Sequence, residues 1–314
     1  MDPAPARDDC LPSPAAVSSV AEWLDFPADL IRELHDLARA AADQPWAIAE
    51  LRRLDQGLDR TERLEHLPRP FWAVQAPGPD TPDPSAKGWS RCVDLLPLLA
   101  LLTRVPRVLR LHQQRDVPAA VSRDTLDDLL RWARKFRVQH GRWGLAETHW
   151  LVQAVAGRIF RLGRLQFEWV TNRWPALPLA EDAWLLSVHV PEMGPLDHAA
   201  CDASFDHARR FFLRHFPERR ASAYVCDSWL LDPQLAEYLP AQTNIIRFQR
   251  RFTVLPEACY PRDEITPRIL PTPAAKDTDP AQDARPSRLQ QAVAEHRRLG
   301  RTWQSGVGYR LIDA

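Results

Sequence analysis

The sequence lacks an excess of charge of either sign, because its 314 residues include 41 basic and 41 acidic side chains. This balance argues against a disordered chain and against a protein that binds nucleic acid through a basic field over its whole length. Cysteine is also scarce, with five residues and no CxxC pair. Scattered cysteines argue against a disulfide scaffold and indicate a reducing compartment.

Long apolar runs are absent as well. The longest, Val93 to Leu102, contains Asp94 and Pro97 and is too short to cross a bilayer. The opening residues, MDPAPARDDC, carry acids where a signal peptide needs a basic start and an apolar stretch. We therefore expect a cytoplasmic protein without a membrane partner.

Proline and tryptophan are frequent instead, with 29 and 12 residues. The many prolines predict short elements joined by rigid connections. The length and the 45% apolar content suggest about two domains with enough chain to bury a real core.

Helical spacing of apolar residues dominates the first half of the chain, which predicts a helical N-terminal domain over residues 21–150. Residues 1–20 are rich in Ala, Pro, Ser and Asp and are expected to be loose. Six prolines between residues 68 and 90 predict a loop. Helices are expected over Pro27 to Ala42, Asp94 to Thr103, Pro106 to Arg115, and from a Ser122 cap to Gln139.

The second half changes to a mixture of strand and helix patterns. Strands are expected at 158–170, 183–190, 223–231 and 244–255 and at the closing segment GVGYRLI, with helices over 198–215 and 286–299. This order predicts an α/β or α+β domain with a central mixed sheet over residues 151–314.

The most informative segment is a strand followed by the turn PEMGPLD and a helix. Free backbone N–H groups and the positive end of the helix dipole make such a junction a natural anion site. A plain connection between a strand and a helix has the same pattern, so both interpretations stand at this point.

Several ordered segments resemble a known family. They are GRLQFEW (163–169), LSVHVPEMGPLD (186–197), VCDSWLLDPQLAEYLP (225–240), NIIRFQRRF (244–252) and SRLQQAVAEHRRLG (287–300). These segments resemble the GNAT-like C-terminal domain of bacterial acyltransferases, and the helical first half resembles the N-terminal N-acyltransferase domain that accompanies it. The resemblance covers roughly residues 20 to 312 and implies transfer of an acyl group from acyl-CoA, with acetyl-CoA as the expected donor, to a small amine or hydroxyl acceptor.

The resemblance also implies where the co-substrate binds, without any metal. The strand at 185–190 would separate from its neighbour and pair with the pantetheine arm, with a backbone N–H near Val188 or Val190 polarising the thioester carbonyl. The pyrophosphate of CoA would lie on the turn that follows this strand. The turn residues expected to contact it are Glu192, Met193, Gly194 and Leu196.

Catalytic residues follow from the same resemblance and from residue chemistry. Tyr238 matches the tyrosine that protonates the leaving thiolate in the GNAT fold. The base that takes the acceptor's proton is expected to be His189 or Glu168, with Asp227 as a further candidate. For each of them the alternative is a polar residue that is simply satisfied at the edge of the sheet or in the core.

One departure from the GNAT pattern leaves two rival functions open. The usual pyrophosphate loop reads Gln/Arg-x-x-Gly-x-Gly/Ala, whereas this chain has only Gly194, followed by Pro195, which has no N–H to donate. The rivals are a non-catalytic GNAT-like binding or sensor module and a protein that joins a partner through its tryptophan-rich surface.

Other patterns are weaker. Cys201 and Cys226 lack a nucleophile signature and are interpreted as buried apolar residues. The run RFQRRF at 247–252 is interpreted as an exposed strand face and not as a nucleic-acid site. No His pair at helical i, i+4 spacing supports a metal site.

Overall fold

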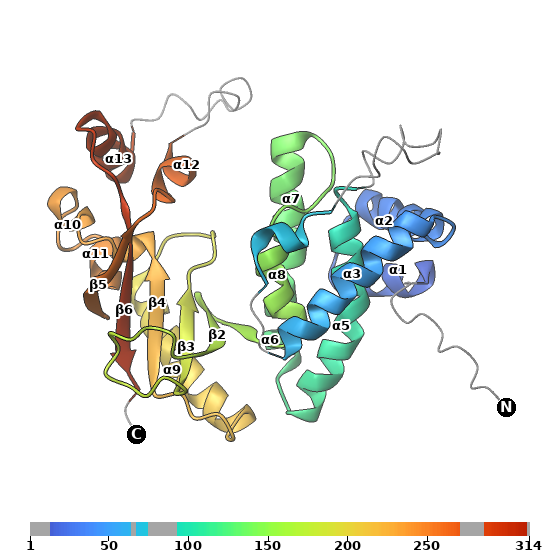
Figure 1. Cartoon of the computed structure of the whole chain (residues 1–314), viewed down its shortest axis with the longest axis horizontal. Helices are drawn as coiled ribbons and strands as arrows, with labels where there is room; N and C mark the ends of the chain where they lie inside the picture. The colour runs from blue at the N-terminus through green and yellow to red at the C-terminus, as the bar shows by residue number, and fades with distance from the viewer. Residues whose placement is uncertain (1–12, 64–66, 75–92, 271–285, 313–314) are drawn as a thin grey trace. The chain divides into compact units, whose positions relative to one another are not determined.

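The computed structural model describes residues 13–63, 67–74, 93–270 and 286–312. It divides into two compact units, Met1–Phe160 and Arg161–Ala314. The described elements of the first unit are helices, except for the strand that begins at its end, and the second unit is built around a sheet (Figure 1). None of the helices in the described ranges has the length and apolar character needed to cross a bilayer.

The N-terminal unit buries one apolar cluster between its helices. Buried leucines such as Leu34 of α2, Leu54 of α3 and Leu99 of α5 recur at helical spacing, which explains why these segments are helices. The elements are α1 (Pro14–Trp23), α2 (Ala28–Ala42), α3 (Pro45–Glu62), the 3-10 helix η1 (Arg69–Trp72), α5 (Leu96–Gln114), α6 (Ala119–Leu126), α7 (Asp128–His140) and α8 (Thr148–Val155).

Helix α1 lies partly inside the segment that was expected to be loose, so that expectation is wrong from Pro14 onward. Ser13 caps the helix by accepting a hydrogen bond from the backbone N–H of Ala16 at 3.2 Å. Val17 and Ala21 are buried in the common cluster, and their burial stabilises the helix.

Two further boundaries differ from the sequence prediction. The two helices predicted over 94–103 and 106–115 are one helix, α5 (Leu96–Gln114), with Pro106 inside it, because apolar burial on both sides of the proline outweighs the lost backbone hydrogen bond. The helix predicted from a Ser122 cap is two helices, α6 and α7, that meet at Asp127. Ser122 lies inside α6 and contacts His112 with its hydroxyl.

The C-terminal unit contains a six-stranded mixed sheet of order β1-β2-β3-β4-β6-β5. The strands are β1 (Ile159–Leu162), β2 (Leu165–Thr171), β3 (Trp184–His189), β4 (Ala223–Ser228), β5 (Thr253–Pro261) and β6 (Gln304–Leu311). The β3–β4 pair is parallel, whereas the β2–β3, β4–β6 and β5–β6 pairs are antiparallel. The predicted order of a helical domain followed by a mixed-sheet α+β domain is confirmed.

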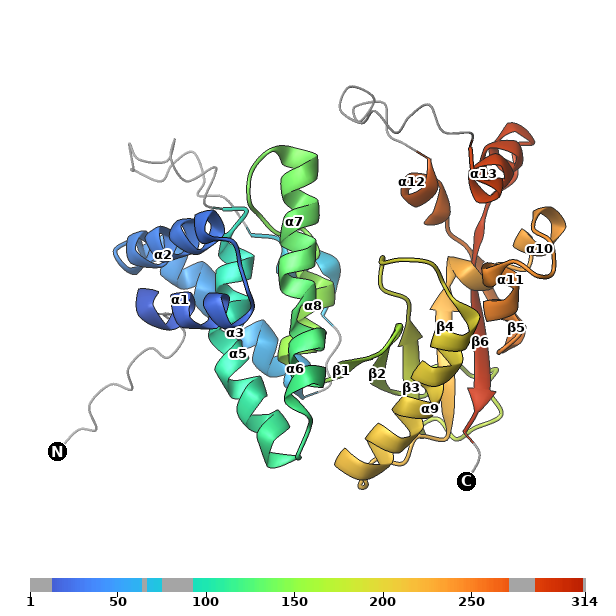
Figure 2. The ribbon, with the colours of Figure 1, turned by 180° about the vertical axis from the view of Figure 1, so that it is seen from behind.

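Helix α9 (His198–His215) covers one face of this sheet (Figure 2). Aromatic side chains fill the space between them, with ring centroids 5.7 Å apart for Phe167 and Phe205 and 4.7 Å apart for Trp169 and Phe212. The predicted helix over 198–215 is confirmed. The opposite face of the sheet carries a smaller apolar cluster that includes Leu185, Val225 and Val307.

The long strand predicted over 244–255 is wrong in its first half. Residues Asn244–Gln249 form a short helix, α11, and β5 begins only at Thr253. The Gln249 side chain donates hydrogen bonds to the carbonyls of Leu230 and Asp232 at 2.8 and 2.9 Å. These tertiary contacts stabilise α11 although the β-propensity of the segment favours a strand. The remaining elements are η2 (Trp229–Leu231), α10 (Leu235–Tyr238), α12 (Ile265–Ile269) and α13 (Arg288–Arg298).

Candidate active site

The parallel ladder between β3 and β4 ends before either strand does. Leu185, Leu186 and Ser187 lie opposite residues 223–225, and the described register has no β3–β4 pair beyond Ser187. β3 continues to His189, and β4 continues to Ser228. The backbone edge at Val188 and His189 is therefore outside the ladder with β4, which is where the sequence placed the pantetheine arm.

His189 and Glu168 form a pair on the sheet face opposite α9. In the β2–β3 register His189 lies opposite Gln166 and Glu168 opposite Ser187, so the two side chains are diagonal neighbours on one face. Their Nε2 and Oε2 atoms are 3.1 Å apart. The Glu168 side chain is 8% exposed, whereas the His189 side chain is 27% exposed. A half-exposed imidazole held by a buried carboxylate is suited to take a proton from a ligand above the sheet.

Asp227, the third candidate base, belongs to a separate network on the same face. Its Oδ1 accepts hydrogen bonds from the Ser305 hydroxyl at 2.8 Å and from the Tyr260 hydroxyl at 3.1 Å. Arg262 donates to the Tyr260 oxygen at 3.2 Å, and this hydrogen bond raises the pKa of Arg262. The sequence did not point to Tyr260, Arg262 or Ser305, because only the register of β5 and β6 brings them to β4.

The turn between β3 and α9 is held by arginine side chains that the sequence analysis also missed. The guanidinium group of Arg164 donates to the carbonyls of Pro195, Pro191 and Gly194 at 3.0, 3.1 and 3.3 Å. Gly194 has φ of +58°, a left-handed conformation that favours glycine. Arg161 contacts the sulfur of Met193 in the same turn.

Charged groups next to the turn are largely compensated. Glu192 forms an ion pair with Arg268 of α12, so its carboxylate does not face a phosphate ligand alone. Asp197 caps α9 and accepts a hydrogen bond from the Ala200 N–H at 2.8 Å. One of the amides at the start of the helix is therefore already satisfied by the chain itself.

Tyr238 lies at the end of α10, with its hydroxyl 3.0 Å from His296 Nδ1 of α13. Arg301 donates to the same hydroxyl at 3.2 Å. The Tyr238 ring packs in a cluster with Trp303, with centroids 6.0 Å apart. These contacts join α10 to α13, and the role of Tyr238 as an acid stays a prediction.

Comparisons with known proteins decide what kind of protein carries this site. Residues 15–157 match the family model of the N-acyltransferase N-terminal domain, and residues 159–310 match that of the GNAT-like C-terminal domain. The chain belongs to the acyltransferases that combine these two domains. The resemblance inferred from the sequence is thereby confirmed.

Solved structures agree with this assignment. A variant acyltransferase in complex with octanoyl-CoA is 29% identical, with a TM-score of 0.73 over 96% of this chain and 90% of that one. An acyltransferase in complex with decanoyl-CoA is 28% identical, with a TM-score of 0.69 over 99% and 91%. An acyltransferase in complex with decanoyl-CoA and teicoplanin is 28% identical, with a TM-score of 0.61 over 95% and 99%. No functionally curated protein matches the sequence.

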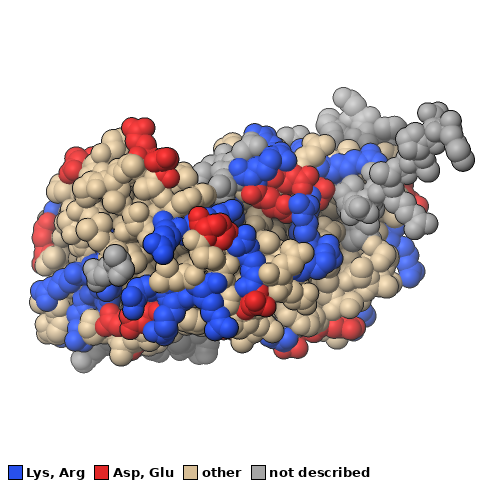
Figure 3. All heavy atoms as spheres, turned by 90° about the horizontal axis from the view of Figure 1, so that it is seen from below, with Lys and Arg blue, Asp and Glu red and all other residues tan. Residues whose placement is uncertain are grey.

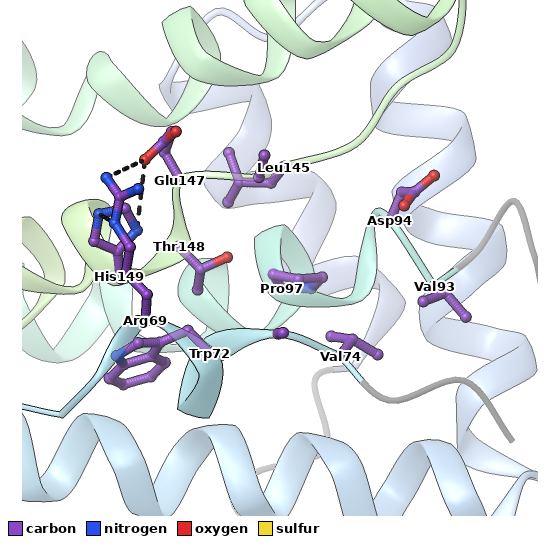
Figure 4. A pocket seen from close by; sticks show the side chains of 12 residues that line it. Arg69, Trp72, Val74, Val93, Asp94, Pro97, Leu145, Glu147, Thr148 and His149 are labelled. Atoms are coloured by element: carbon purple, nitrogen blue, oxygen red, sulfur yellow. Dashed lines mark hydrogen bonds and ion pairs between the residues drawn. The ribbon is translucent and has the colours of Figure 1, made fainter. Parts of the chain in front are cut away.

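The N-terminal domain of this acyltransferase contains a pocket of about 240 Å³ (Figure 4). One side is polar: Arg69 Nε donates to His149 Nε2 at 2.8 Å, and Glu147 lies 3.5 Å from His149 Nδ1. Burial and the nearby Arg69 lower the pKa of His149. Apolar side chains form other parts of the lining and include Trp72, Val74, Pro97 and Leu145. Residues 68–90 were predicted to be a loop, but the 3-10 helix η1 lies within this range and supplies Arg69 and Trp72.

The weaker sequence patterns do not contribute to the site. Cys201 and Cys226 are buried, and burial raises the pKa of both thiols, which makes them poor nucleophiles. In the described residues no group of three or more His, Cys, Asp or Glu side chains is arranged to hold a metal ion. Basic and acidic side chains are interspersed on the face shown in Figure 3.

Proposed function

We propose that this acyltransferase moves an acyl group from acyl-CoA directly to an amine or hydroxyl of a small acceptor. The observation that carries the proposal is the His189–Glu168 pair beside the point where the β3–β4 ladder ends. In this proposal the pantetheine arm lies along β3 beyond its last described pair with β4, next to the base. Solved relatives in complex with octanoyl-CoA and decanoyl-CoA support the choice of donor.

The reaction would proceed without a covalent enzyme intermediate. A backbone N–H near Val188 or Val190 polarises the thioester carbonyl while the acceptor attacks the carbonyl carbon. His189 removes the acceptor's proton, and Glu168 stabilises the charged imidazole. The new N–C or O–C bond forms, the C–S bond breaks, and the thiolate leaves. Tyr238 is the proposed donor of the proton that the thiolate takes.

The donor's chain length and the acceptor belong to this proposal. Acetyl-CoA is the donor expected from the sequence, but two solved relatives hold acyl chains of octanoyl and decanoyl length, so medium chains must be tested beside it. One relative was solved with teicoplanin, so a large acceptor must be tested beside the small amines and alcohols that the sequence predicted. We propose that the pocket of the N-terminal domain binds part of this acceptor. A cytoplasmic location remains a prediction.

Calorimetric titration with acetyl-CoA, octanoyl-CoA and free CoA tests the donor site directly. An added Cβ at Gly194 meets no heavy atom within 4 Å, and because Asp and Asn both tolerate its left-handed φ of +58° better than most side chains, the two variants strain the turn to a similar degree. Gly194→Asp should weaken octanoyl-CoA binding more than Gly194→Asn, because the two side chains have the same shape and only the first repels phosphate.

Binding must be followed by turnover to establish the enzyme. Release of free CoA in the presence of amine and alcohol acceptors, measured with a thiol reagent, is the expected result. Tight binding of octanoyl-CoA with no thiol release for any acceptor would favour the rival function, a non-catalytic sensor module. No binding to a well-folded sample would contradict the donor assignment itself.

A further inference from the structure

We propose that Arg164 is a positioning residue that shapes the turn 191–196 into the diphosphate site of the donor. This inference rests on the proposed function, because it requires that CoA is the donor. Typical GNAT loops use several glycines for this purpose, whereas this turn contains Gly194 as its one glycine and Pro195 directly after it. In this chain the guanidinium group of Arg164, from the β1–β2 hairpin, holds the turn in place of the missing glycines.

The first argument is the direction of the peptide groups. Arg164 holds the carbonyls of Pro191 and Pro195 at 3.1 and 3.0 Å. In a trans peptide the C=O and the N–H of the next residue point in opposite directions, and the described residues include no cis peptide. The N–H groups of Glu192 and Leu196 are therefore directed away from the guanidinium. In the proposed site these two N–H groups are the donors that the turn would offer to the diphosphate.

The second argument is how firmly Arg164 is placed. Its backbone N–H donates to the hydroxyl of Ser204 at 2.8 Å, and Ser204 lies in α9 and is 1% exposed. The neighbouring Gly163 has φ of +79°, and a Cβ there would lie 3.0 Å from the Ser204 oxygen. The hairpin therefore docks closely on the helix that follows the turn through the Arg164 backbone, while the Arg164 guanidinium holds the turn.

The third argument is charge. Arg164 places a positive charge directly behind the turn, and Arg161 adds a second one at Met193. The carboxylate of Glu192, which would oppose a diphosphate, is paired with Arg268. A cation behind outward-facing N–H groups strengthens binding of a dianionic ligand, and a neutral ligand gains nothing from it.

The test compares two donors that differ in the nucleotide diphosphate. Octanoyl-CoA carries the diphosphate and octanoyl-pantetheine does not, so calorimetry gives a dissociation constant for each with wild type and variants. Arg164→Met, which keeps length but removes the donors, should weaken octanoyl-CoA binding about 10- to 100-fold and leave octanoyl-pantetheine binding within about twofold. Arg210→Met is the matched control, because Arg210 is an exposed arginine of α9 in the same domain.

Arg164→Lys separates shape from charge and serves where the methionine variant fails to fold. Lysine keeps the charge but has one nitrogen in place of the planar guanidinium, whose three nitrogens each donate to a different carbonyl, so we expect an intermediate loss for octanoyl-CoA. Full wild-type affinity in the lysine variant would overturn the role in shaping the turn. An equal loss for both donors, or no loss in a folded methionine variant, would overturn the inference while leaving CoA as the donor. If wild-type protein binds neither donor, the proposed function fails with it.

Discussion

The imidazole Nε2 of His189 lies 3.1 Å from the carboxylate Oε2 of Glu168, on neighbouring strands β3 and β2. The two residues are not opposite each other in the ladder but diagonal, on the face that α9 does not cover. The two candidate bases are thus a single unit, in which the buried carboxylate orients the more exposed imidazole. Their roles can be separated by substitution.

We expect His189→Gln to lower kcat by about 10²- to 10⁴-fold, because the variant has no base at this position. Glu168→Gln should cause a smaller loss, since the imidazole remains and only its orientation and charge stabilisation change. Neither variant should alter the dissociation constant of octanoyl-CoA. If Glu168→Gln is the more damaging of the two, the carboxylate and not the imidazole is the base.

Tyr238→Phe distinguishes an acid from a packing residue. The variant loses the hydroxyl contacts with His296 and Arg301 in either case, so stability should fall by about 1 kcal/mol, as for one lost hydrogen bond. If Tyr238 protonates the leaving thiolate, kcat falls as well, whereas turnover of the folded variant is unchanged if the hydroxyl serves only these contacts. Thermal unfolding and steady-state kinetics on the same sample distinguish these results, and unchanged turnover removes Tyr238 from the mechanism.

His112 should make the N-terminal domain sensitive to acid. The side chain is 1% exposed, and burial lowers its pKa from 6.5 to about 4. The unfolded chain therefore binds a proton below pH 6.5 that the folded domain rejects until about pH 4. This difference costs about 3 kcal/mol of stability, lost as the pH falls through that window.

Urea unfolding of wild type and His112→Gln at several pH values between 7 and 4 would measure this contribution. The glutamine variant does not titrate, so its free energy of unfolding should fall less steeply over the window. Ser122→Ala, which removes the 2.9 Å hydroxyl contact of His112 Nδ1, is the control and should keep the wild-type slope. Parallel curves for wild type and His112→Gln would contradict the prediction.

Arg104 joins α5 to α3 through ion pairs made by its buried guanidinium group. Its side chain is 8% exposed and lies 2.5 Å from Asp55 and 2.8 Å from Asp59. Arg104→Met leaves these carboxylates without their main partner and should destabilise the domain by about 3 kcal/mol. Arg107 pairs with Glu62 but is 55% exposed, so Arg107→Met should cost less than about 1 kcal/mol. Equal losses of unfolding free energy for the two variants in urea would contradict the prediction that burial makes the Arg104 ion pairs the stronger ones.

Filling the pocket of the N-terminal domain tests its proposed role in acceptor binding. Ala146 lines the pocket, and Ala146→Trp should raise the KM for the acceptor at least about tenfold by occupying the space. The dissociation constant of octanoyl-CoA should not change. Val138 is 87% exposed on α7, so Val138→Trp is the control and should leave both constants unchanged. An unaltered KM in a folded Ala146→Trp variant would place the acceptor elsewhere.

The spacing of apolar residues within one segment was enough to predict some of the helices and strands. The apolar spacing of Cys201, Phe205, Ala208 and Phe212 specifies a helix whatever it packs against, and α9 begins and ends where the sequence predicted. The apolar segment at 183–190 likewise predicted β3 to within a residue at each end. The segments that resemble the family also predicted the turn between these two elements.

What the tertiary structure decided is which distant residues meet. Residues 244–249 were predicted to be part of a long strand, yet contacts of Gln249 with residues 230 and 232 accompany a helix there. Arg164 reaches a turn about thirty residues away, and Tyr260 reaches Asp227, through hydrogen bonds that no local pattern encodes. Spacing along one segment records only which side chains are buried. Strand register and long-range polar contacts depend on the packing of the whole domain, and this packing decided how Glu168 and His189 pair.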